Sequence, residues 1–356
     1  MYIHEKDNWT SFRWDASVLT AILEEVSRKQ GLLYGRLASL GFDSKLKAMA
    51  ENLTHDVVCS SEIEGVRLNV DEVRSSIAQK LGIENVRQTA PSHYVDSVVA
   101  VMLDAVSHYD QTLTKEKICA WQAAFFPSGY SKGSRIEVGR YRTHEECIVS
   151  GMFGKEKIHY VAPPPERLDE EMAKFLDWFN SREEASSVLR SAIAHFWFVS
   201  IHPFEDGNGR LARILSDMLL ARADKSEFRF YNISSQINKN KNHYYDILEK
   251  TQHSDGDITE WISWYAHTLS VALDEAGDIV STILNKSFFW QRISSVPLSQ
   301  RQTDMLNLFL DGYEAKITTK TWAALAKCSK DTAQRDIHDL VEKDILREDM
   351  WFPELG

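Results

Sequence analysis

The sequence predicts a mainly α-helical protein with one small β-hairpin. Leu19, Ile22 and Val26 recur at the spacing of a helix face, with charged residues opposite. Two apolar runs, Ile193–Ile201 and Leu211–Leu220, flank a glycine-containing segment and indicate a helix, a loop and a second helix. A chain of 356 residues is long enough for two or three domains. We expect an N-terminal helical region over residues 1–88, a helical core over 89–288 and a C-terminal domain over 289–356.

The N-terminal region is expected to be helical from about Asp15 to Ile83. It contains Ser60-Ser61-Glu62-Ile63-Glu64-Gly65, in which Ser60 and Glu64 are four residues apart and so share one helix face. Taken alone, this segment is an acidic helical turn closed by a glycine. The polar stretch from Gly82 to Pro91 then predicts a linker into the core, which begins with an apolar helix from Tyr94 to Val106.

A short region of strand signals lies between Pro127 and Pro165, where Gly, Ser and Pro become frequent. Cys147–Val149, followed by Ser150-Gly151, predicts a strand that enters a turn. Ile158–Val161 predicts its antiparallel partner, and three consecutive prolines end it. We therefore expect a hairpin here, and a surface hairpin without a functional role is the alternative.

The segment from His202 to Arg213, H-P-F-E-D-G-N-G-R-L-A-R, carries most of the chemistry. His202 is the side chain in it whose ordinary pKa suits proton abstraction near neutral pH. Asp206 offers hard carboxylate oxygens, which suit Mg²⁺ bound to phosphate oxygens. Gly207 and Gly209 permit unusual backbone angles and let a phosphate approach the main chain.

The same segment predicts an anion site. Its loop is expected to lead into a helix N-terminus, where the first backbone N–H groups are unpaired and the helix dipole is positive. Arg210 and Arg213 add planar guanidinium groups three residues apart, which suit phosphate oxygens. A base, a metal ligand and a phosphate cradle thus fall within twelve residues.

The segment matches without departure the signature H-P-F-x-[DE]-G-N-G-R-x-x-R, so the chain resembles the Fic family. The resemblance implies that the motif joins two helices of an all-α core. It also implies AMPylation, the transfer of AMP from ATP to a protein Ser, Thr or Tyr hydroxyl with release of pyrophosphate. His202 would be the general base and Asp206 would hold Mg²⁺. The residues implied to bind phosphates are Gly207, Asn208, Gly209, Arg210 and Arg213, the last at the γ-phosphate.

The resemblance implies roles for two earlier segments. Ser60 and Glu64 match the family's inhibitory motif [ST]-x-x-x-E-[GN], and Glu64 would pair with Arg213 and exclude a productive γ-phosphate. The expected hairpin corresponds to the Fic flap, which clamps the target backbone by strand addition. Ile148 and Val149 are the candidates for contact with the target side chain.

After the motif, Fic proteins place an aromatic residue and an asparagine beside the nucleotide base. The candidates in this chain are Asn240, Tyr244 and Tyr245. Core packing explains either tyrosine equally well. His195, seven residues before His202, is expected to be a core histidine.

The tail from Pro297 to Gly356 resembles a winged helix-turn-helix domain. Its expected elements are helices over Leu298–Leu310, Thr321–Lys327 and Asp331–Lys343, and a β wing over Ile345–Arg347 and Trp351-Phe352. The third helix of such a module enters the major groove of DNA, and the side chains it would direct there are Lys330, Thr332, Gln334 and Arg335. The tail has 8 Lys and Arg against 11 Asp and Glu, whereas DNA-binding modules are usually basic. A protein-docking or homodimerisation role is at least as well supported.

The whole chain is acidic, with 41 Lys and Arg, 52 Asp and Glu and a net charge of −11. This charge argues against a general nucleic-acid or membrane-surface binder. The four cysteines are scattered without the pair spacing of a metal site. The N-terminus lacks the apolar stretch of a signal peptide, and no window reaches the roughly 18 apolar residues of a membrane span. We therefore expect a cytoplasmic protein without membrane association.

Two alternatives to an autoinhibited AMP transferase stay open. One is a transcriptional regulator that senses ATP and binds DNA, although a pure sensor would not need His202. The other keeps the fold but changes the chemistry, to removal of AMP from a modified protein or to transfer of another nucleotide. The expected partners are ATP and a protein substrate, which includes the chain itself.

Overall fold

The computed structural model describes residues 1–83, 89–151, 157–181, 186–227, 229–310, 313 and 316–347. It is 66% helical with two small antiparallel hairpins, which confirms the mainly α prediction. The chain divides into two compact units, Met1–Gly277 and Asp278–Gly356. The N-terminal region and the core, expected as separate domains over 1–88 and 89–288, thus belong to one unit.

The start of the N-terminal region contacts the core directly. The Trp9 indole donates a hydrogen bond to Glu171 (3.0 Å) and packs edge-on against Trp197. Arg13 N–H donates to the Gly256 carbonyl at 2.8 Å. A short 3₁₀ turn, η1, lies at the start, and the helices that follow are α1 (Ala16–Ala38), α2 (Phe42–Ile63) and α3 (Val70–Leu81).

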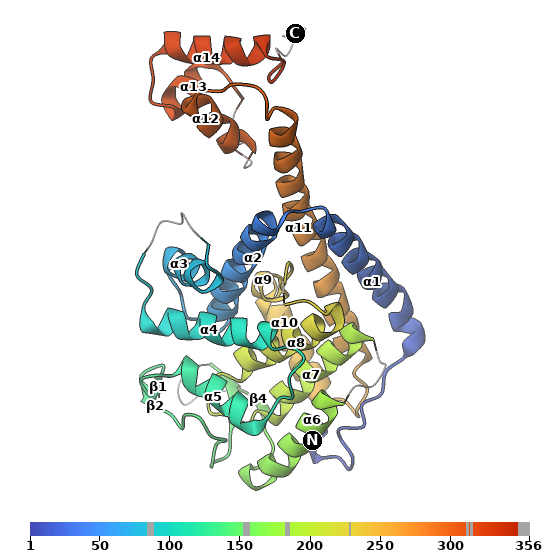
Figure 1. Cartoon of the computed structure of the whole chain (residues 1–356). Coiled ribbons are helices and arrows are strands. Elements are labelled where there is room, and N and C mark those ends of the chain that lie inside the picture. The colour runs from blue at the N-terminus through green and yellow to red at the C-terminus, as the bar shows by residue number, and fades with distance from the viewer. Residues whose placement is uncertain are drawn as a thin grey trace. The chain divides into compact units, whose positions relative to one another are not determined.

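The centre of this first unit is a pair of buried helices. The core helices are α4 (His93–Ser107), α5 (Lys115–Phe125), α6 (Leu168–Asn180), α7 (Ser187–Ile201), α8 (Asn208–Asp224), α9 (Ser234–Lys239), α10 (Lys241–Gln252) and the part of α11 (Thr259–Arg292) up to Gly277. Helices α7 and α8 pack together in the middle (Figure 1). Every residue of α7 from Val188 to Ile201 is buried. A helix enclosed on all sides has no need of a polar face.

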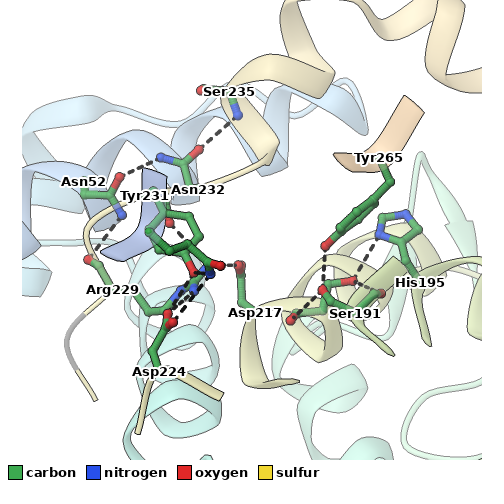
Figure 2. A network of polar contacts seen from close by, with 12 residues as sticks. Asn52, Ser191, His195, Asp217, Asp224, Arg229, Tyr231, Asn232, Ser235 and Tyr265 are labelled. Atoms are coloured by element: carbon green, nitrogen blue, oxygen red, sulfur yellow. Dashed lines mark hydrogen bonds and ion pairs between the residues drawn. The ribbon is translucent and has the colours of Figure 1, made fainter. Parts of the chain in front are cut away.

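Several polar side chains on these buried helices bond each other or side chains of α10 and α11. Ser191 lies 2.6 Å from the Tyr265 hydroxyl (Figure 2). His195 bonds the hydroxyls of Ser216 and Tyr244. Burial lowers the pKa of His195 to about 3, so its ring is neutral. His195 therefore lies in the core and acts there as a hydrogen-bonding residue.

Two hairpins interrupt the helices. The predicted one consists of β3 (Cys147–Ser150) and β4 (Lys157–Val161), with Ile148 opposite Tyr160 and an irregular register after Ile148. A second, shorter hairpin of β1 (Tyr130–Ser131) and β2 (Ser134–Arg135) was not predicted. Its turn residues Lys132 and Gly133 both have positive φ, as in a tight two-residue turn. Strands of two residues are too short to show any hydrophobic alternation.

The second unit has its own helices and core. The helices α12 (Gln300–Leu310), α13 (Thr319–Leu325) and α14 (Lys330–Glu342) begin and end within two residues of the predicted bounds. Met305, Leu306, Trp322, Ala333 and Leu340 form the centre of its core. Residues 345–347, predicted as the first half of the wing, form no strand among the described residues, and Trp351 and Phe352 lie outside them.

A membrane span was also sought among the helices. Within the described ranges, no helix is both long and apolar enough to cross a bilayer.

Candidate active site

The catalytic loop begins where α7 ends, at His202. The residue has φ +51°, and its N–H still donates to the Phe198 carbonyl (3.0 Å). Ring nitrogen Nδ1 lies 3.2 Å from the Val199 carbonyl, which can only accept, so Nδ1 carries the proton and Nε2 keeps its lone pair. Burial lowers the pKa of His202 to about 4. Near neutral pH the ring is therefore an uncharged base with a free Nε2.

The loop after His202 is held in shape by Asn208 and Gly207. The Asn208 amide donates to the Phe204 carbonyl (2.6 Å) and accepts from Phe204 N–H (3.1 Å). Gly207 has φ +92°, and a Cβ there would lie 3.1 Å from the Phe126 ring. Both polar atoms of the Asn208 side chain thus bond within the loop, and its backbone N–H lies at the start of α8, where a ligand can reach it.

Asp206 is oriented by groups from three parts of the chain. Its carboxylate accepts from Gly207 N–H (2.6 Å) and from the Ser131 hydroxyl of β1. Gln122 of α5 donates to the Asp206 carbonyl at 3.3 Å. These bonds use one lone pair of each carboxylate oxygen and leave others available.

The two motif arginines each keep one buried N–H without a partner. Arg210 stacks on the Phe125 and Phe126 rings and donates to the Tyr94 hydroxyl (2.8 Å). Arg213 is 1% exposed. Among the described residues, Arg210 Nε and Arg213 Nη1 have no hydrogen-bond acceptor. A buried donor without an acceptor is costly, so these atoms indicate a place for an anion.

Glu64 lies directly above the first turn of α8. Arg213 donates to Glu64 Oε1 (2.8 Å) through Nη2, and to the Ser60 hydroxyl (2.9 Å) through Nε. Burial alone would lower the pKa of Arg213, but the charge and hydrogen bond of Glu64, together with Tyr244 and Tyr245, outweigh burial, and the pKa is raised. A Cβ added at Gly209 would lie 2.5 Å from Glu64 Oε1. The Glu64 carboxylate therefore occupies the surface of α8 that the dipole and the free N–H groups prepare for an anion.

Comparison with known families agrees with this geometry. The Fic/DOC family model matches residues 112–220, which include the whole loop from His202 to Arg213. Over this region the chain is similar to the Fic/DOC family. A domain of unknown function, DUF4172, matches residues 2–83.

Curated relatives of this chain match only part of their own length. The protein adenylyltransferase Fic of Nematostella vectensis is 24% identical over 257 residues, or 71% of this chain and 55% of that protein. That of Drosophila willistoni is 33% identical over 136 residues, or 37% of this chain and 26% of that protein. The chain thus spans about half, or less, of the length of these relatives.

Solved Fic structures share the fold. A Fic family protein from Desulfovibrio desulfuricans G20 superposes with a TM-score of 0.58 at 18% identity, and the match covers 92% of this chain and 90% of that one. A Fic domain containing signaling protein from Bacteroides thetaiotaomicron gives 0.55 at 20% identity, over 73% and 97%. At these identities the likeness concerns the fold alone.

The predicted flap presents apolar side chains to solvent. Val149 is 48% exposed and Ile148 is half-buried. Tyr160 of β4 is buried and donates to the Ser200 carbonyl of α7 (2.8 Å), so β4 is the strand fixed to the core. In the part of the chain that the structure describes, the outer edge of β3 pairs with no other strand, which leaves it open to strand addition.

The three residues predicted to contact the base lie in different environments. Tyr244 is 2% exposed and its hydroxyl bonds His195, so its ring belongs to the core. Asn240 is exposed and Tyr245 is 42% exposed. Only these last two offer surface to a nucleotide.

Several residues that shape the site carry no local signal in the sequence. Ser131, Tyr94 and Gln122 lie far from the motif in the chain, and each bonds one of its members. Nothing in their neighbourhood distinguishes them, because their partners are chosen by the packing of α4, α5 and the β1–β2 hairpin around α8.

Asp206 fits Mg²⁺ as a single carboxylate ligand. Across the described ranges, no three or more His, Cys, Asp or Glu side chains gather into a metal cage. At nucleotide sites Mg²⁺ is commonly held by one or two carboxylates, the substrate phosphates and water. One carboxylate beside a phosphate site is therefore a suitable donor set.

Proposed function

We propose that this protein transfers AMP from ATP to a hydroxyl of a protein, and that Glu64 restrains the reaction. The observation that carries this proposal is the start of α8. There, a neutral His202 with a free Nε2 precedes a helix N-terminus flanked by unpaired N–H groups of Arg210 and Arg213. A base beside an anion site is what transfer of a nucleotidyl group to a hydroxyl requires.

In the proposed step, His202 Nε2 takes the proton of the target hydroxyl. The hydroxyl oxygen then forms a bond to the α-phosphorus of ATP, and the bond from that phosphorus to the β-phosphate oxygen breaks, releasing pyrophosphate. Arg210, Arg213 and the first N–H groups of α8 stabilise the phosphate charge. Mg²⁺ on Asp206 would supply further charge neutralisation.

The restraint follows from the position of the Glu64 carboxylate. It accepts from Arg213 and lies against Gly209, so a terminal phosphate and Glu64 compete for the same N–H groups. The backbone that carries Glu64 is itself anchored, since Lys241 donates to the Ile63 carbonyl and Asn238 donates to Glu62 (2.8 Å). In the resting protein the terminal phosphate of ATP should therefore be kept from Arg213 and Gly209, so that the bound triphosphate is not placed for transfer.

The target is proposed to be a protein segment in extended conformation. The free edge of β3 offers main-chain N–H and C=O groups for strand addition, which holds a peptide with little demand on its sequence. The chain's own exposed segments are candidates, so we expect self-modification as well as modification of another protein.

Glu64→Gly is the direct test. Purified protein is incubated with ATP labelled on the α-phosphate and with Mg²⁺, and the label on protein is measured. Removal of the competing carboxylate should raise labelling by roughly tenfold or more, since 1.4 kcal/mol corresponds to a factor of ten. Glu51→Gly, a matched change at an exposed position of α2 away from Arg213, should leave labelling at the wild-type level.

Adding His202→Ala to the Glu64→Gly variant should abolish the labelling. Equal labelling with and without His202 would eliminate it as the base. Mass spectrometry of the product identifies the added group and the modified residue. A nucleotide other than AMP, or loss of AMP from a pre-modified protein, would support one of the alternative chemistries.

A further inference from the structure

Arg142 lies buried between the catalytic loop and the flap. It is 2% exposed, and its guanidinium donates to three main-chain oxygens, while its backbone N–H donates to a fourth. Nε donates to the His202 carbonyl (2.9 Å), and the Arg142 backbone N–H donates to the Pro203 carbonyl (2.9 Å). Nη1 donates to the His144 carbonyl (2.7 Å) and Nη2 to that of Pro163 (2.6 Å).

These four acceptors belong to two functional parts. His202 and Pro203 start the catalytic loop, whereas His144 precedes β3 and Pro163 follows β4. A main-chain bond from Ala162 N–H to the Glu146 carbonyl (3.0 Å) closes the base of the same hairpin. One planar group thus contacts the backbone of the general base and both ends of the flap.

We propose that Arg142 is a positioning residue that holds His202 and the flap in one register, so that a hydroxyl on a strand added to β3 meets Nε2. The inference rests on the proposed function. His202 has φ +51°, a conformation that disfavours any residue with a side chain. The bonds to the carbonyls of His202 and Pro203 stabilise this turn from outside α7.

Arginine is suited to this position by its geometry. The guanidinium presents its donors in fixed, coplanar directions, whereas a lysine ammonium acts as a compact point charge. Lysine could keep the charge but could not reach the loop and both flap ends together. Since a misplacement of about 1 Å can lower a rate by about 100-fold, loss of the common register should act mainly on transfer.

The phosphate-binding groups do not depend on Arg142. In the described part of the chain, Arg210 bonds Tyr94 and Arg213 bonds Ser60 and Glu64, and neither contacts Arg142. Nucleotide affinity should therefore survive substitution of Arg142. This separates a positioning role from a general loss of structure, which would lower affinity and rate together.

The charge of Arg142 provides a second signature. Burial is the main cause of the low pKa of His202, and the charged groups that act on the ring are Arg142, which lowers the pKa, and Asp206 and Glu64, which raise it. Arg142→Gln should raise the pKa of His202, whereas Arg142→Lys should leave it low. Titration of the labelled His202 ring by NMR measures this in the absence of any turnover.

The experiment compares Arg142→Lys and Arg142→Gln in the full-length Glu64→Gly protein. Arg190→Lys is the matched control, because Arg190 is also buried and donates to the carbonyls of Trp178 (2.7 Å) and Ser181 (2.9 Å), away from the loop. We expect both Arg142 variants to bind a non-hydrolysable ATP analogue within about twofold of the parent while kcat falls by about 100-fold. Arg190→Lys should lower Tm and keep kcat.

An unchanged kcat in Arg142→Lys, or an equal loss of affinity and kcat in both Arg142 variants, would overturn the inference. If the Glu64→Gly parent itself transfers no label, the proposed function fails. In that case the His202 titration still decides about Arg142: an upward pKa shift confined to Arg142→Gln supports its contact with the base, and an unchanged pKa refutes it.

Discussion

Asn208 serves the shape of the catalytic loop more than its ligand. Both polar atoms of its amide bond the backbone of Phe204, and the side chain is 2% exposed. A residue that donates and accepts at once has no isosteric replacement, because a carboxylate lacks the donor and a hydrophobic side chain lacks both. Loop geometry and the first turn of α8 thus depend on one amide.

Asn208→Asp should therefore destabilise the protein. The carboxylate would face the Phe204 carbonyl, so one bond is lost and repulsion replaces it. We expect a loss of about 1–3 kcal/mol in the free energy of unfolding of the first unit, measured by urea denaturation. The exposed Asn240→Asp is the control and should change stability by less than about 0.5 kcal/mol. Equal effects of the two changes would contradict the assigned role.

For single residues, the sequence predicts the chemistry of the motif but not the distant residues that hydrogen-bond to it. His202, Asp206 and the two arginines are recognisable because their types and spacing lie within one segment. Ser131 and Arg142 act on the same loop from 60 or more positions away, as the separation of 60 between Arg142 and His202 shows. Only the folded chain brings them together.

Helices α2 and α8 meet through residues spaced by four on each. On α2 these are Asp56, Ser60 and Glu64. On α8 they are Gly209, Arg213 and Asp217. The contacts of Glu64 with Gly209 and of Ser60 with Arg213 set an antiparallel order, which brings Asp56 towards Asp217. One end of this interface therefore pairs opposite charges, and the other brings two acids together.

Asp56 should make stability depend on pH. Burial, and next the charge of Asp217, raises the pKa of Asp56 to about 7, while Arg229 and Arg213 act in the opposite direction. Between pH 4 and pH 7 the folded state then binds a proton that the unfolded state has lost, so rising pH costs stability. Asp56→Asn removes this cost, and its stability relative to wild type should increase from pH 4 to pH 8 by at least about 1 kcal/mol.

Urea unfolding at a series of pH values measures this difference. Asp246→Asn, an exposed change on α10, should show a constant difference across the same range. A constant difference for Asp56→Asn as well would mean that the carboxyl is ionised throughout.

The two apolar runs located α7 and α8, although both helices extend beyond them, α7 by six residues at its start. Helix periodicity predicted α4 and the three helices of the second unit within two residues. It predicted neither β1–β2, whose strands are too short to alternate, nor the attachment of the N-terminal region to the core. That attachment depends on single side chains such as Trp9, whose partner Glu171 lies 162 positions away. The local hydrophobic pattern predicts the individual helices, whereas contacts between residues far apart in the chain determine which helices pack into one unit.

On the scale of the whole molecule, the second unit has its own apolar core and its own buried polar cluster. Trp322 is fully buried and its Nε1 donates to Asp336 (3.2 Å). Arg301 binds the same carboxylate through two bonds of 2.5 and 2.9 Å. A small unit with this one centre should lose its fold when the centre is removed.

Trp322→Ala should unfold the second unit and spare the first. The expected cost is about 3–5 kcal/mol, seen as the loss of one transition in thermal unfolding. ATP-dependent labelling in the Glu64→Gly protein should persist, because the catalytic groups all lie in the first unit. If labelling disappears together with that transition, the second unit takes part in the reaction. A gel shift with DNA at stated salt concentration tests the DNA-binding alternative for the same unit.

The contact between Glu64 and Gly209 has a consequence for mutational routes to an active enzyme. In the proposed function, the Glu64 carboxylate and the terminal phosphate compete for the same surface of α8 at Gly209. A substitution on α8 that displaces the carboxylate would therefore also obstruct the phosphate. Substitutions that increase activity are therefore expected at Glu64 and its neighbours at the end of α2. In a random library selected for labelling, active variants should accumulate between residues 56 and 65 and be depleted between residues 207 and 213. The restraint can then be weakened by substitutions around Glu64 but not by substitutions at the start of α8.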